Sequence, residues 1–379
     1  MHRTAIAGRS RDVLEGPISY PGGVVMSPSK KLVMAVKVCV GAVALVASMA
    51  FAATPASAEH VRCGQVILVS TVLDSNVGPC PNNGVIIGND NVTLDLNGHQ
   101  IFGTGKPGDG AGVLVSQRRN VEVRNGTVRH FDGGVVIEGG SDNRVLRVTA
   151  KDNIGKSGST PSAPGTQYGD GIAILSSSNN LVEGNTALHN GPYSGIGVFE
   201  RVDSDHPRQV TGPAEGNVIR RNQVLANNIC RTPHGPCDND GIRLEPGVQF
   251  NTVAENYVRG SALDGISLFR TSDDNVVVGN TVEHNGHHRA AHRKGDGIRV
   301  FSNRNLVENN RSFHNGADGI GVGFRTPRGV IVPATNNRII ANRTGFNRVF
   351  DLHDFNPGCD ANVWSRNTYR TAEPPCTRG

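Results

Sequence analysis

The sequence predicts an all-β solenoid, in which the chain winds into a single parallel β-helix of about ten coils. The first observation is a pair of Asn residues five positions apart, which returns in seven successive segments. The second is an apolar residue two positions after the first Asn of every pair. Fixed offsets of this kind are typical of one coil repeated many times. The seven pairs are Asn180/Asn185, Asn217/Asn222, Asn251/Asn256, Asn275/Asn280, Asn305/Asn310, Asn337/Asn342 and Asn362/Asn367.

Each coil is expected to contain three short strands joined by turns. Val276–Val278 and Thr281–Glu283 are separated by Gly-Asn, and a third apolar run at 298–301 follows an Asp-Gly-Ile. These runs are too short for helices, and they are rich in β-branched residues between turn formers. We expect equivalent Asn side chains to form columns, with Asn itself in the left-handed conformation of each corner. Looser members extend the series toward the N-terminus: Asn91, Asn120 and Asn143.

Residues 1–58 are expected to form a leader that the mature protein lacks. Three lysines precede an almost entirely apolar run at 38–51, and an Ala-Ser-Ala cleavage site ends at Ala58. That order is typical of a secretory signal peptide, and the apolar run is too short for a membrane span. Residues 1–25 have no place in such a peptide, which indicates a start site further along the chain. We therefore expect a secreted domain at 59–379 without a membrane span.

The composition argues against a nucleic-acid partner. The whole chain carries a formal charge of +5. Residues 1–58 contain six basic and two acidic residues, so the remainder has 32 basic and 31 acidic residues and a net charge of +1. The basic character therefore owes much to the leader, and a nucleic-acid-binding function loses its support. We expect a monomer.

Six cysteines follow the leader, an even number for an oxidising compartment. They fall into three local couples, which we expect to be disulfides that staple the solenoid, two of them at its ends. Zinc is the competing interpretation, but the couples lack the usual Cys-x-x-Cys spacing. The couples are Cys63/Cys80, Cys230/Cys237 and Cys359/Cys376.

A column of carboxylates is the strongest candidate site. Five coils carry Asp-Gly-Ile, and Ser194 takes the place of the Asp in a sixth. Stacked carboxylates about 5 Å apart repel one another, so something must offset the charge. One interpretation is that each Asp accepts hydrogen bonds from turn amides; the other is a cation, either calcium at Asp264, Asp296 and Asp318 or the nearby arginines Arg243 and Arg299. The five are Asp170, Asp240, Asp264, Asp296 and Asp318.

Histidine recurs directly before the third Asn of a coil, at His189, His284 and His314. These residues are interpreted either as a stacked column of turn residues or as general bases beside the carboxylates, with Lys294 as a further candidate base. The loop that contains Lys294 is the most basic stretch after the leader. It is either a solvated loop or a clamp for an anionic polymer that closes near Asp296. Its histidines are His287, His288 and His292.

Two smaller groups of residues complete the candidates. Tyr168 and Tyr193 precede equivalent strands of neighbouring coils, where their rings could stack on sugar faces or simply pack within loops. Asp351, His353 and Asp354 lie in what reads as the terminal coil, and they form a polar cluster that could bind a metal.

Long insertions are expected to wall a groove across the third sheet of the solenoid. Three precede the Asp-Gly-Ile strand, at 154–169, 228–239 and 286–295. Two others follow that strand, at 200–216 and 324–336. Loops on a rigid scaffold are where binding and catalysis are usually found.

The chain resembles secreted right-handed parallel β-helix proteins of the pectin and pectate-lyase-like superfamily, and within it the carbohydrate-binding NosD-type branch. The resemblance covers roughly 60–377 and rests on the Leu-Asp-Leu-Asn-Gly-His-Gln-Ile segment at 94–101, the Asn and Asp-Gly-Ile repeats, and the tail from Cys359 to Cys376. It implies lyases, uronate epimerases or hydrolases with clustered Asp residues. The Gly-His-Gly of the hydrolases is missing, and Asp351-Leu352-His353 departs from the Asp-Pro-His of alginate epimerases.

Three functional hypotheses follow. The first is a lyase or epimerase acting on acidic polysaccharide, in which Arg243, Arg299 or bound calcium neutralises the sugar carboxylate and His284, His314 or Lys294 removes the C5 proton. The second is a non-catalytic carbohydrate-binding or cell-surface solenoid. The third is a metal-handling NosD-like protein, which the absence of methionine after the leader weakens for copper.

Overall fold

The computed structural model describes residues 58–106, 110–155, 169–200, 212–229, 239–288, 294–326 and 328–379. These residues belong to one compact unit. The predicted leader lies outside them except for Ala58, so the signal peptide stays a prediction. In the described ranges, no helix has the length and apolar character needed to cross a bilayer.

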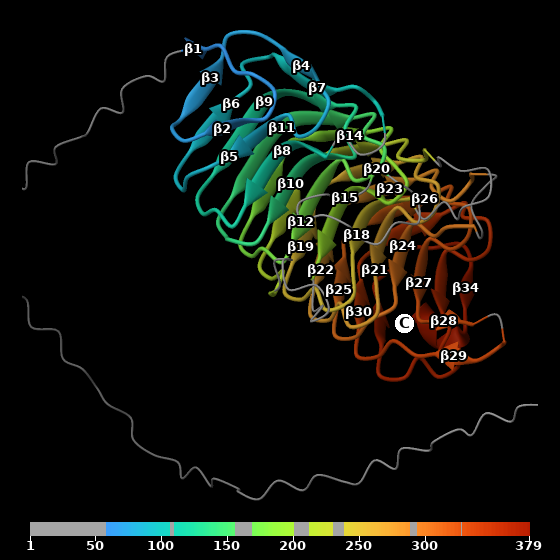
Figure 1. Cartoon of the computed structure of the whole chain (residues 1–379). Coiled ribbons are helices and arrows are strands. Elements are labelled where there is room, and N and C mark those ends of the chain that lie inside the picture. The colour runs from blue at the N-terminus through green and yellow to red at the C-terminus, as the bar shows by residue number, and fades with distance from the viewer. Residues whose placement is uncertain are drawn as a thin grey trace, which may run out of the picture. The chain divides into compact units, whose positions relative to one another are not determined.

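The chain winds through two parallel sheets, which run the length of the unit (Figure 1). Sheet B has twelve strands in the described part of the chain: β2 (Gln65–Ile67), β5 (Val85–Ile87), β8 (Ala111–Ser116), β10 (Gly133–Glu138), β12 (Ile172–Leu175), β15 (Ser194–Phe199), β18 (Asp240–Leu244), β21 (Ile266–Leu268), β24 (Ile298–Val300), β27 (Ile320–Val322), β32 (Leu352–Asp354) and β34 (Ala372–Glu373). Ten of these strands match the ten predicted coils, and β2 and β34 add one rung at either end.

Sheet A has twenty strands in the described ranges, because most coils contribute two. They are β1 (Ala58–Glu59), β3 (Thr71–Leu73), β4 (Val77–Cys80), β6 (Thr93–Asp95), β7 (Gln100–Gly103), β9 (Glu122–Arg129), β11 (Arg144–Lys151), β13 (Leu181–Glu183), β14 (Thr186–Leu188), β16 (Val218–Arg220), β17 (Gln223–Leu225), β19 (Thr252–Ala254), β20 (Tyr257–Arg259), β22 (Val276–Val278), β23 (Thr281–Glu283), β25 (Leu306–Glu308), β26 (Arg311–Phe313), β30 (Arg338–Ile340), β31 (Arg343–Gly345) and β33 (Val363–Ser365). A short antiparallel hairpin, β28 (Phe324–Arg325) and β29 (Ile331–Val332), and one 3-10 turn, η1 (Pro375–Arg378), complete the elements.

One coil shows how the repeat builds the fold. Strands β22, β23 and β24 follow one another in the chain, and they pair in parallel with β25, β26 and β27 of the next coil. The middle residue of each sheet A strand points inward: Val277 and Val307 are partners in the register and both are fully buried. The predicted coil of three short strands is confirmed. Because most three-residue strands of sheet A bury one small or aliphatic residue, a narrow core forms with few aromatic rings.

Buried Asn side chains form ladders along the corners, as the repeat predicts. The side-chain oxygen of Asn310 accepts both the backbone N–H and the side-chain amide of Asn280, each at 2.9 Å. The Asn280 amide also donates to the carbonyl of Val253 at 2.9 Å. The Asn280 oxygen in turn accepts the N–H of Asn256, so its side chain satisfies two backbone groups of the coil before it and bonds the ladder Asn of the coil after it. Such pairing is the requirement for burying a polar corner.

The left-handed conformation expected of Asn is found at Asn91 and Asn120, with φ of 59° and 54°, but not at the Asn residues of the seven regular pairs. In those pairs the residue before the Asn adopts the left-handed conformation. His284 has a φ of 56° and Asn309 a φ of 55°, whereas the ladder residues that follow them, Asn285 and Asn310, do not have a positive φ. The reason is geometric, since the Asn must keep its amide inside the corner to continue the ladder. The residue before it points outward and adopts the left-handed backbone conformation of the bend, which is energetically unfavourable for residues other than Gly.

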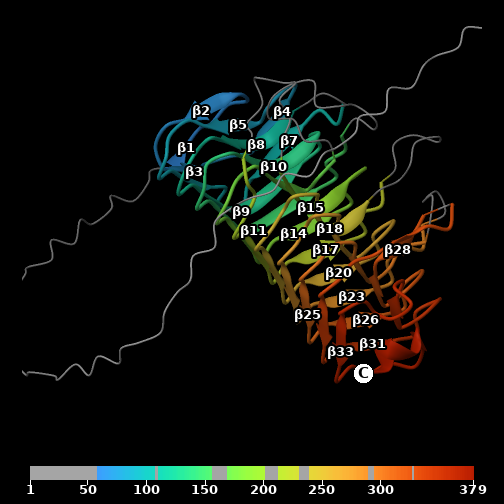
Figure 2. The same cartoon turned by 90° about the horizontal axis from the view of Figure 1, so that it is seen from below.

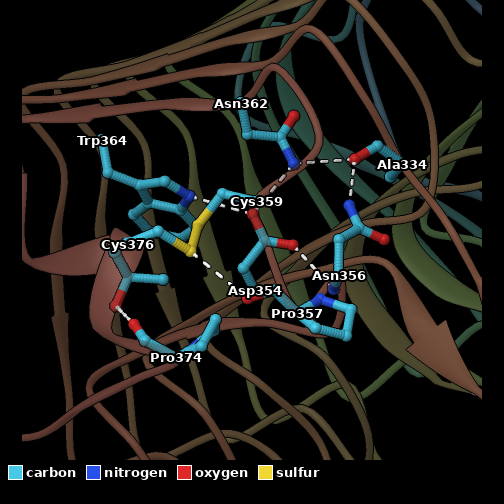
Figure 3. The surroundings of a disulfide bond; sticks show 10 residues. Ala334, Asp354, Asn356, Pro357, Cys359, Asn362, Trp364, Pro374 and Cys376 are labelled. Atoms are coloured by element: carbon cyan, nitrogen blue, oxygen red, sulfur yellow. Dashed lines mark hydrogen bonds between the residues drawn. A yellow bond between two sulfur atoms is a disulfide. The ribbon is translucent and has the colours of Figure 1, made fainter.

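Disulfides close both ends of the described part. Cys63 bonds Cys80 and Cys359 bonds Cys376, which confirms two of the three predicted couples. The second of these lies beside the side chain of Trp364 in the terminal coil (Figure 3). The predicted Cys230–Cys237 couple lies outside the described residues. Two disulfides fit an oxidising compartment such as the periplasm or the extracellular space.

The predicted groove walls fall mostly outside the described residues. Of the five insertions, the one at 324–336 is described almost completely, and it contains the hairpin of β28 and β29. The other four are described only at their ends, so the groove stays a prediction.

Candidate functional site

One row of outward-facing residues on sheet B, here called the outward row, changes from apolar to polar along the solenoid. The residues at one register position are apolar in the first coils, and polar or small in the later ones. The polar half lies over β18, β21, β24, β27 and β32, which places the candidate site there. In chain order the row is Ile86, Leu114, Val136, Ala173, Gly197, Arg243, Ser267, Arg299, Gly321 and His353.

The Asp column stands directly beside this row and forms a ladder of its own. One carboxylate oxygen of each Asp accepts the backbone N–H of the residue one coil further on. The distances are 2.7 Å from Asp296 to Asp264, 2.9 Å from Asp318 to Asp296, and 3.0 Å from Phe350 to Asp318. The expectation that turn amides offset the repulsion is therefore confirmed for this oxygen.

The second carboxylate oxygen points to the outward row. Ser267 donates to Asp240 at 2.7 Å, and Arg299 donates to Asp296 at 2.5 Å. His353 Nδ1 lies 2.8 Å from Asp318 Oδ2. Asp240, Asp296 and Asp318 thus each use one oxygen to hold the fold and the other to bond a side chain of the outward row.

Both arginines of the site lie over aromatic rings. The Arg243 guanidinium is 4.1 Å from the Phe269 ring centre, and its Nε is 2.5 Å from a Glu245 oxygen. Arg299 lies between two rings, at 4.4 Å from Phe301 and 5.3 Å from Phe355. Stacking and ion pairing fix these guanidinium groups, so their charge is held in one place at the surface of the sheet.

Arg299 retains hydrogen-bonding capacity. Its Nη1 is bonded to Asp296, whereas its Nε is buried and has no hydrogen-bond partner in the described part of the chain. A guanidinium has five donors, so a second anion would have to reach this one through its Nη groups, because the Nε is buried.

A gap in the row lies between Arg299 and His353. Gly321 occupies that position, and a Cβ added there would lie 2.9 Å from Asp296 Oδ2 and 3.6 Å from Asp318 Oδ2. The glycine therefore leaves space beside the two carboxylate oxygens that Arg299 and His353 contact from either side. A group of the size of a sugar ring substituent placed over Gly321 would have Arg299 on one side and His353 on the other.

His353 is oriented for proton transfer. A carboxylate can only accept, so the hydrogen between His353 and Asp318 is carried by Nδ1. The ring stacks on Phe355 at 4.0 Å and meets Phe350 edge-on at 5.0 Å, and its side chain is 17% exposed. Nε2 is left with its lone pair, which makes His353 a candidate general base.

The predicted bases His284 and His314 lie elsewhere. They occupy left-handed corners, stack on each other at 5.1 Å, and His314 stacks in turn on Phe346 at 5.1 Å. Within the described ranges, neither ring has a hydrogen bond or ion pair with the Asp column. Burial and the positive charge of Arg259 lower the pKa of His284. The stacked column of turn residues is therefore what the structure shows.

The basic loop is only partly described. His287 is exposed and its Nε2 lies 2.8 Å from the carbonyl of His314, while His288 is half-buried and Lys294 is exposed. His292 and Tyr168 lie outside the described residues. Tyr193 is half-buried, and its backbone carbonyl accepts the N–H of Asp240 at 2.9 Å.

Metal binding at the Asp column stays a prediction. In the described part of the chain, no three His, Cys, Asp or Glu side chains are placed to hold a metal ion together. The polar cluster of the terminal coil is also divided. Asp351 accepts the backbone amides of 370 and 371, Asp354 accepts the Trp364 indole at 3.0 Å, and His353 turns to the outer face.

Asp170 begins the Asp column and differs from the rest. It is fully buried, accepts a hydrogen bond from the Ser194 hydroxyl, and has an Oδ2 without a partner among the residues that the structure describes. Burial raises the pKa of its carboxyl to about 7, against the opposing effects of the Ser194 hydroxyl and the Arg243 charge. This carboxyl therefore stays protonated into the neutral range.

A cavity of about 460 Å³ lies in the N-terminal half, away from this site. Burial and the charge of Arg129 lower the pKa of His130 at its wall. The described lining residues are Thr104, Gly105, His130, Phe131, Asp152 and Ile154.

Sequence reasoning missed the pairing of His353 with Asp318. The terminal coil lacks Asp-Gly-Ile, so its offsets were not aligned with those of the coils before it. The signal was present, because Leu352 continues the Ile column and His353 then falls in line with Gly321 and Arg299.

Comparison with known proteins agrees with this architecture. A family model described as the right-handed β-helix region matches residues 83–282 and 237–368. The chain belongs to the right-handed β-helix family. The expected right-handed parallel β-helix is thereby confirmed. In sequence, this β-helix protein matches no curated protein.

Two solved structures illustrate the fold of this β-helix protein. The Dettilon tailspike protein gp208 is 15% identical with a TM-score of 0.51, over 80% of this chain and 53% of the tailspike. The periplasmic alginate epimerase AlgG is 14% identical with a TM-score of 0.51, over 80% of this chain and 77% of the epimerase. The β-helix protein thus spans about half of the tailspike. At these identities the likeness shows the fold alone.

Proposed function

We propose that this protein is an exported enzyme that moves a proton at a uronic-acid residue of an acidic polysaccharide, as a lyase or an epimerase. The observation that carries the proposal is the pairing of His353 with Asp318 at the Gly321 gap, with the Arg299 guanidinium on the other side. The likeness in fold to an alginate epimerase is consistent with it. The proposal replaces the predicted bases of the corner column with His353.

The geometry assigns the chemical steps as follows. The sugar carboxylate binds the unused donors of Arg299, which disperses the charge that develops when the neighbouring C5 proton leaves. His353 Nε2 takes that proton, while Asp318 holds the imidazole in the required tautomer and stabilises its charged form. In a lyase the electron pair then forms the C4–C5 double bond and expels the C4 oxygen, which takes a proton from water. In an epimerase C5 is protonated again from the opposite face.

The ion pair with Asp296 limits the affinity of Arg299 for a substrate carboxylate. The Asp296 carboxylate already pairs with Arg299, so the substrate carboxylate must share the guanidinium with it. The pairing lowers the affinity for a uronate and keeps Arg299 from binding one so tightly that turnover stops. Predicted contacts of Asp240, Asp264, Tyr193 and the basic loop with the glycan remain part of this proposal.

The test is a panel of uronate polymers incubated with the protein, with and without calcium. Lyase activity is read from the ultraviolet absorbance of the unsaturated product, and epimerisation from proton NMR of the polymer. We expect activity in the unmodified protein and a loss of roughly a hundredfold or more in His353→Gln, because general-base catalysis contributes about that much.

Two further variants separate chemistry from folding. Asp318→Asn keeps an oxygen for the N–H of Phe350 but cannot accept the His353 hydrogen, so we expect an intact fold and a strongly reduced rate. His284→Gln in the corner column serves as the matched control and should keep full activity. Activity that survives in His353→Gln, or that disappears in His284→Gln, would overturn the assignment.

The alternative is a carbohydrate-binding solenoid without turnover. It is favoured by one observation, namely that every Asp from 240 to 318 in the column already bonds a backbone amide. Retention of a uronate polymer without any product in either assay, equal in the unmodified protein and in His353→Gln, would support this alternative.

A further inference from the structure

The arginines on the outer face of sheet A fall into two groups. Those on the strands of the earlier coils are bonded to neighbouring side chains. Arg124 pairs with Asp95 at 2.8 Å and Arg220 with Glu183 at 2.9 Å, whereas Arg129 and Arg147 bond the amide oxygens of Gln100 and Asn125. The same holds for Arg304 of the later coils, which lies 2.7 Å from Asp274. These arginines contribute to a balanced surface.

The arginines that follow Arg304 on this sheet are different. They are exposed, and none forms an ion pair with any residue in the part of the chain that the structure describes. Strands β25, β26, β30, β31 and β33 contain one acidic residue, Glu308, and it too forms no ion pair within those ranges. We call this group the arginine face: Arg311, Arg338, Arg343, Arg366 and Arg370.

Two members of the arginine face stand directly above one another. Arg311 and Arg343 are partners in the parallel register of β26 and β31. These strands lie side by side with β33 at the C-terminal end of the solenoid (Figure 2). Like charges one rung apart, about 4.8 Å, destabilise a sheet, so the structure retains a repulsion that no neighbouring acid relieves. An anion bound across both guanidinium groups would relieve it.

Aromatic rings flank the arginine face. Phe346 is 59% exposed, and the Arg370 guanidinium lies 4.4 Å from its ring centre. Phe313 is half-buried next to Arg311, whose guanidinium lies 5.5 Å from that ring. Exposed ring surface beside fixed guanidinium groups suits a ligand that has both apolar faces and acidic groups.

We propose that the arginine face binds a strand of acidic polysaccharide and anchors the protein to it. The surface lies on sheet A, whereas the proposed catalytic site lies on sheet B, so this binding stands independently of the proposed chemistry. Guanidinium groups bind carboxylates and sulfates in the same bidentate way. The acidic group of the glycan is therefore carboxyl or sulfate, and the test must distinguish the two.

A glycan is favoured over nucleic acid by the remaining surface. The chain from residue 59 onward has a net charge of only +1, so attraction is confined to this face and fades beyond about 10 Å in physiological salt. Nucleic-acid binding requires a broader basic footprint. The disulfides also fit a compartment outside the cytoplasm, where acidic glycans are the abundant polyanions.

The experiment measures binding of the protein to polygalacturonate, dextran sulfate, neutral dextran and a short DNA duplex, by calorimetry and by affinity electrophoresis. The test variant is Arg311→Gln with Arg343→Gln. The matched control is Arg144→Gln with Arg220→Gln, which removes two exposed but ion-paired arginines of the same sheet and changes the net charge equally. Circular dichroism verifies that both variants are folded.

We expect binding to polygalacturonate or dextran sulfate that weakens with salt, a loss of roughly tenfold in the test variant, and little change in the control. The stronger of the two acidic polymers identifies the acidic group. Dextran sulfate contains no uronate and is therefore no substrate of the proposed reaction, so its binding tests the arginine face even if the catalytic proposal fails. Equal binding by the test variant and the unmodified protein, equal retention on neutral dextran, or preference for DNA would each overturn the proposal.

Discussion

Asp170 makes the stability of this protein depend on pH in an unusual direction. Its carboxyl is fully buried and its Oδ2 has no partner in the described part of the chain, so burial raises its pKa to about 7 from an ordinary value of 3.8. In the unfolded chain the same group is ionised above about pH 4. Between these two values, unfolding releases a proton, and the free energy of unfolding falls as the pH rises.

The magnitude follows from the two pKa values. They differ by about three pH units, and each unit corresponds to about 1.4 kcal/mol, so Asp170 lowers the free energy of unfolding by about 4 kcal/mol between pH 4 and pH 7.5. Above pH 7 the group is ionised in both states and adds no further slope. In Asp170→Asn the side chain is neutral throughout, so this component of the pH dependence disappears.

The assay is equilibrium urea unfolding, followed by far-ultraviolet circular dichroism, from pH 4 to pH 8. The free energy of unfolding of the unmodified protein should fall relative to that of Asp170→Asn by about 4 kcal/mol across this range. Asp142→Asn, at an exposed corner, is the control and should run parallel to the unmodified protein. If the Asp170→Asn curve also runs parallel to it, the carboxyl is not held neutral by burial and the reasoning fails.

Three further predictions follow from the fold. Asn280→Ala removes the side-chain oxygen that accepts the Asn256 N–H and the side-chain amide that donates to the Val253 carbonyl and to Asn310, so we expect a loss of roughly 3–5 kcal/mol in urea unfolding. Gly321→Ala places a methyl group 2.9 Å from a carboxylate oxygen, and we expect weaker uronate binding with a modest drop in melting temperature. Replacing Cys359 and Cys376 by Ser opens a loop with a sequence separation of 17, which should cost about 3 kcal/mol and increase amide exchange in the last coil.

The repeat in the sequence was sufficient to predict the fold because each ladder Asn makes the same hydrogen bonds in its coil. Asn280 must bond the coil before it and the coil after it, so neither its identity nor its offset can change without leaving backbone groups unpaired. That constraint is visible in one sequence without any alignment. The left-handed corners were misplaced because a positive φ leaves no such mark: His284, Asn309 and Ala341 share the conformation and little else.

The site was harder to predict because its residues come from coils with different sequence motifs. The Asp column and Arg299 carry the repeated motif and were found. His353 lies in a coil where Asp-Leu-His stands in register with Gly-Ile-Gly, so its partner could be identified only once β27 and β32 were paired. The corner histidines were chosen instead because they recur, and recurrence in a solenoid marks structural positions more often than catalytic ones.

The Asp column shows why the two sequence interpretations, structural cap and functional carboxylate, did not exclude each other. One oxygen of Asp318 accepts the N–H of Phe350 and the other pairs with His353. A parallel ladder positions the first oxygen at every rung, and it therefore presents the second at the same height on the outer face. What that second oxygen does depends on the side chain in the outward row. Arginine, glycine and histidine on three successive rungs are what separate this part of the column from a purely structural one.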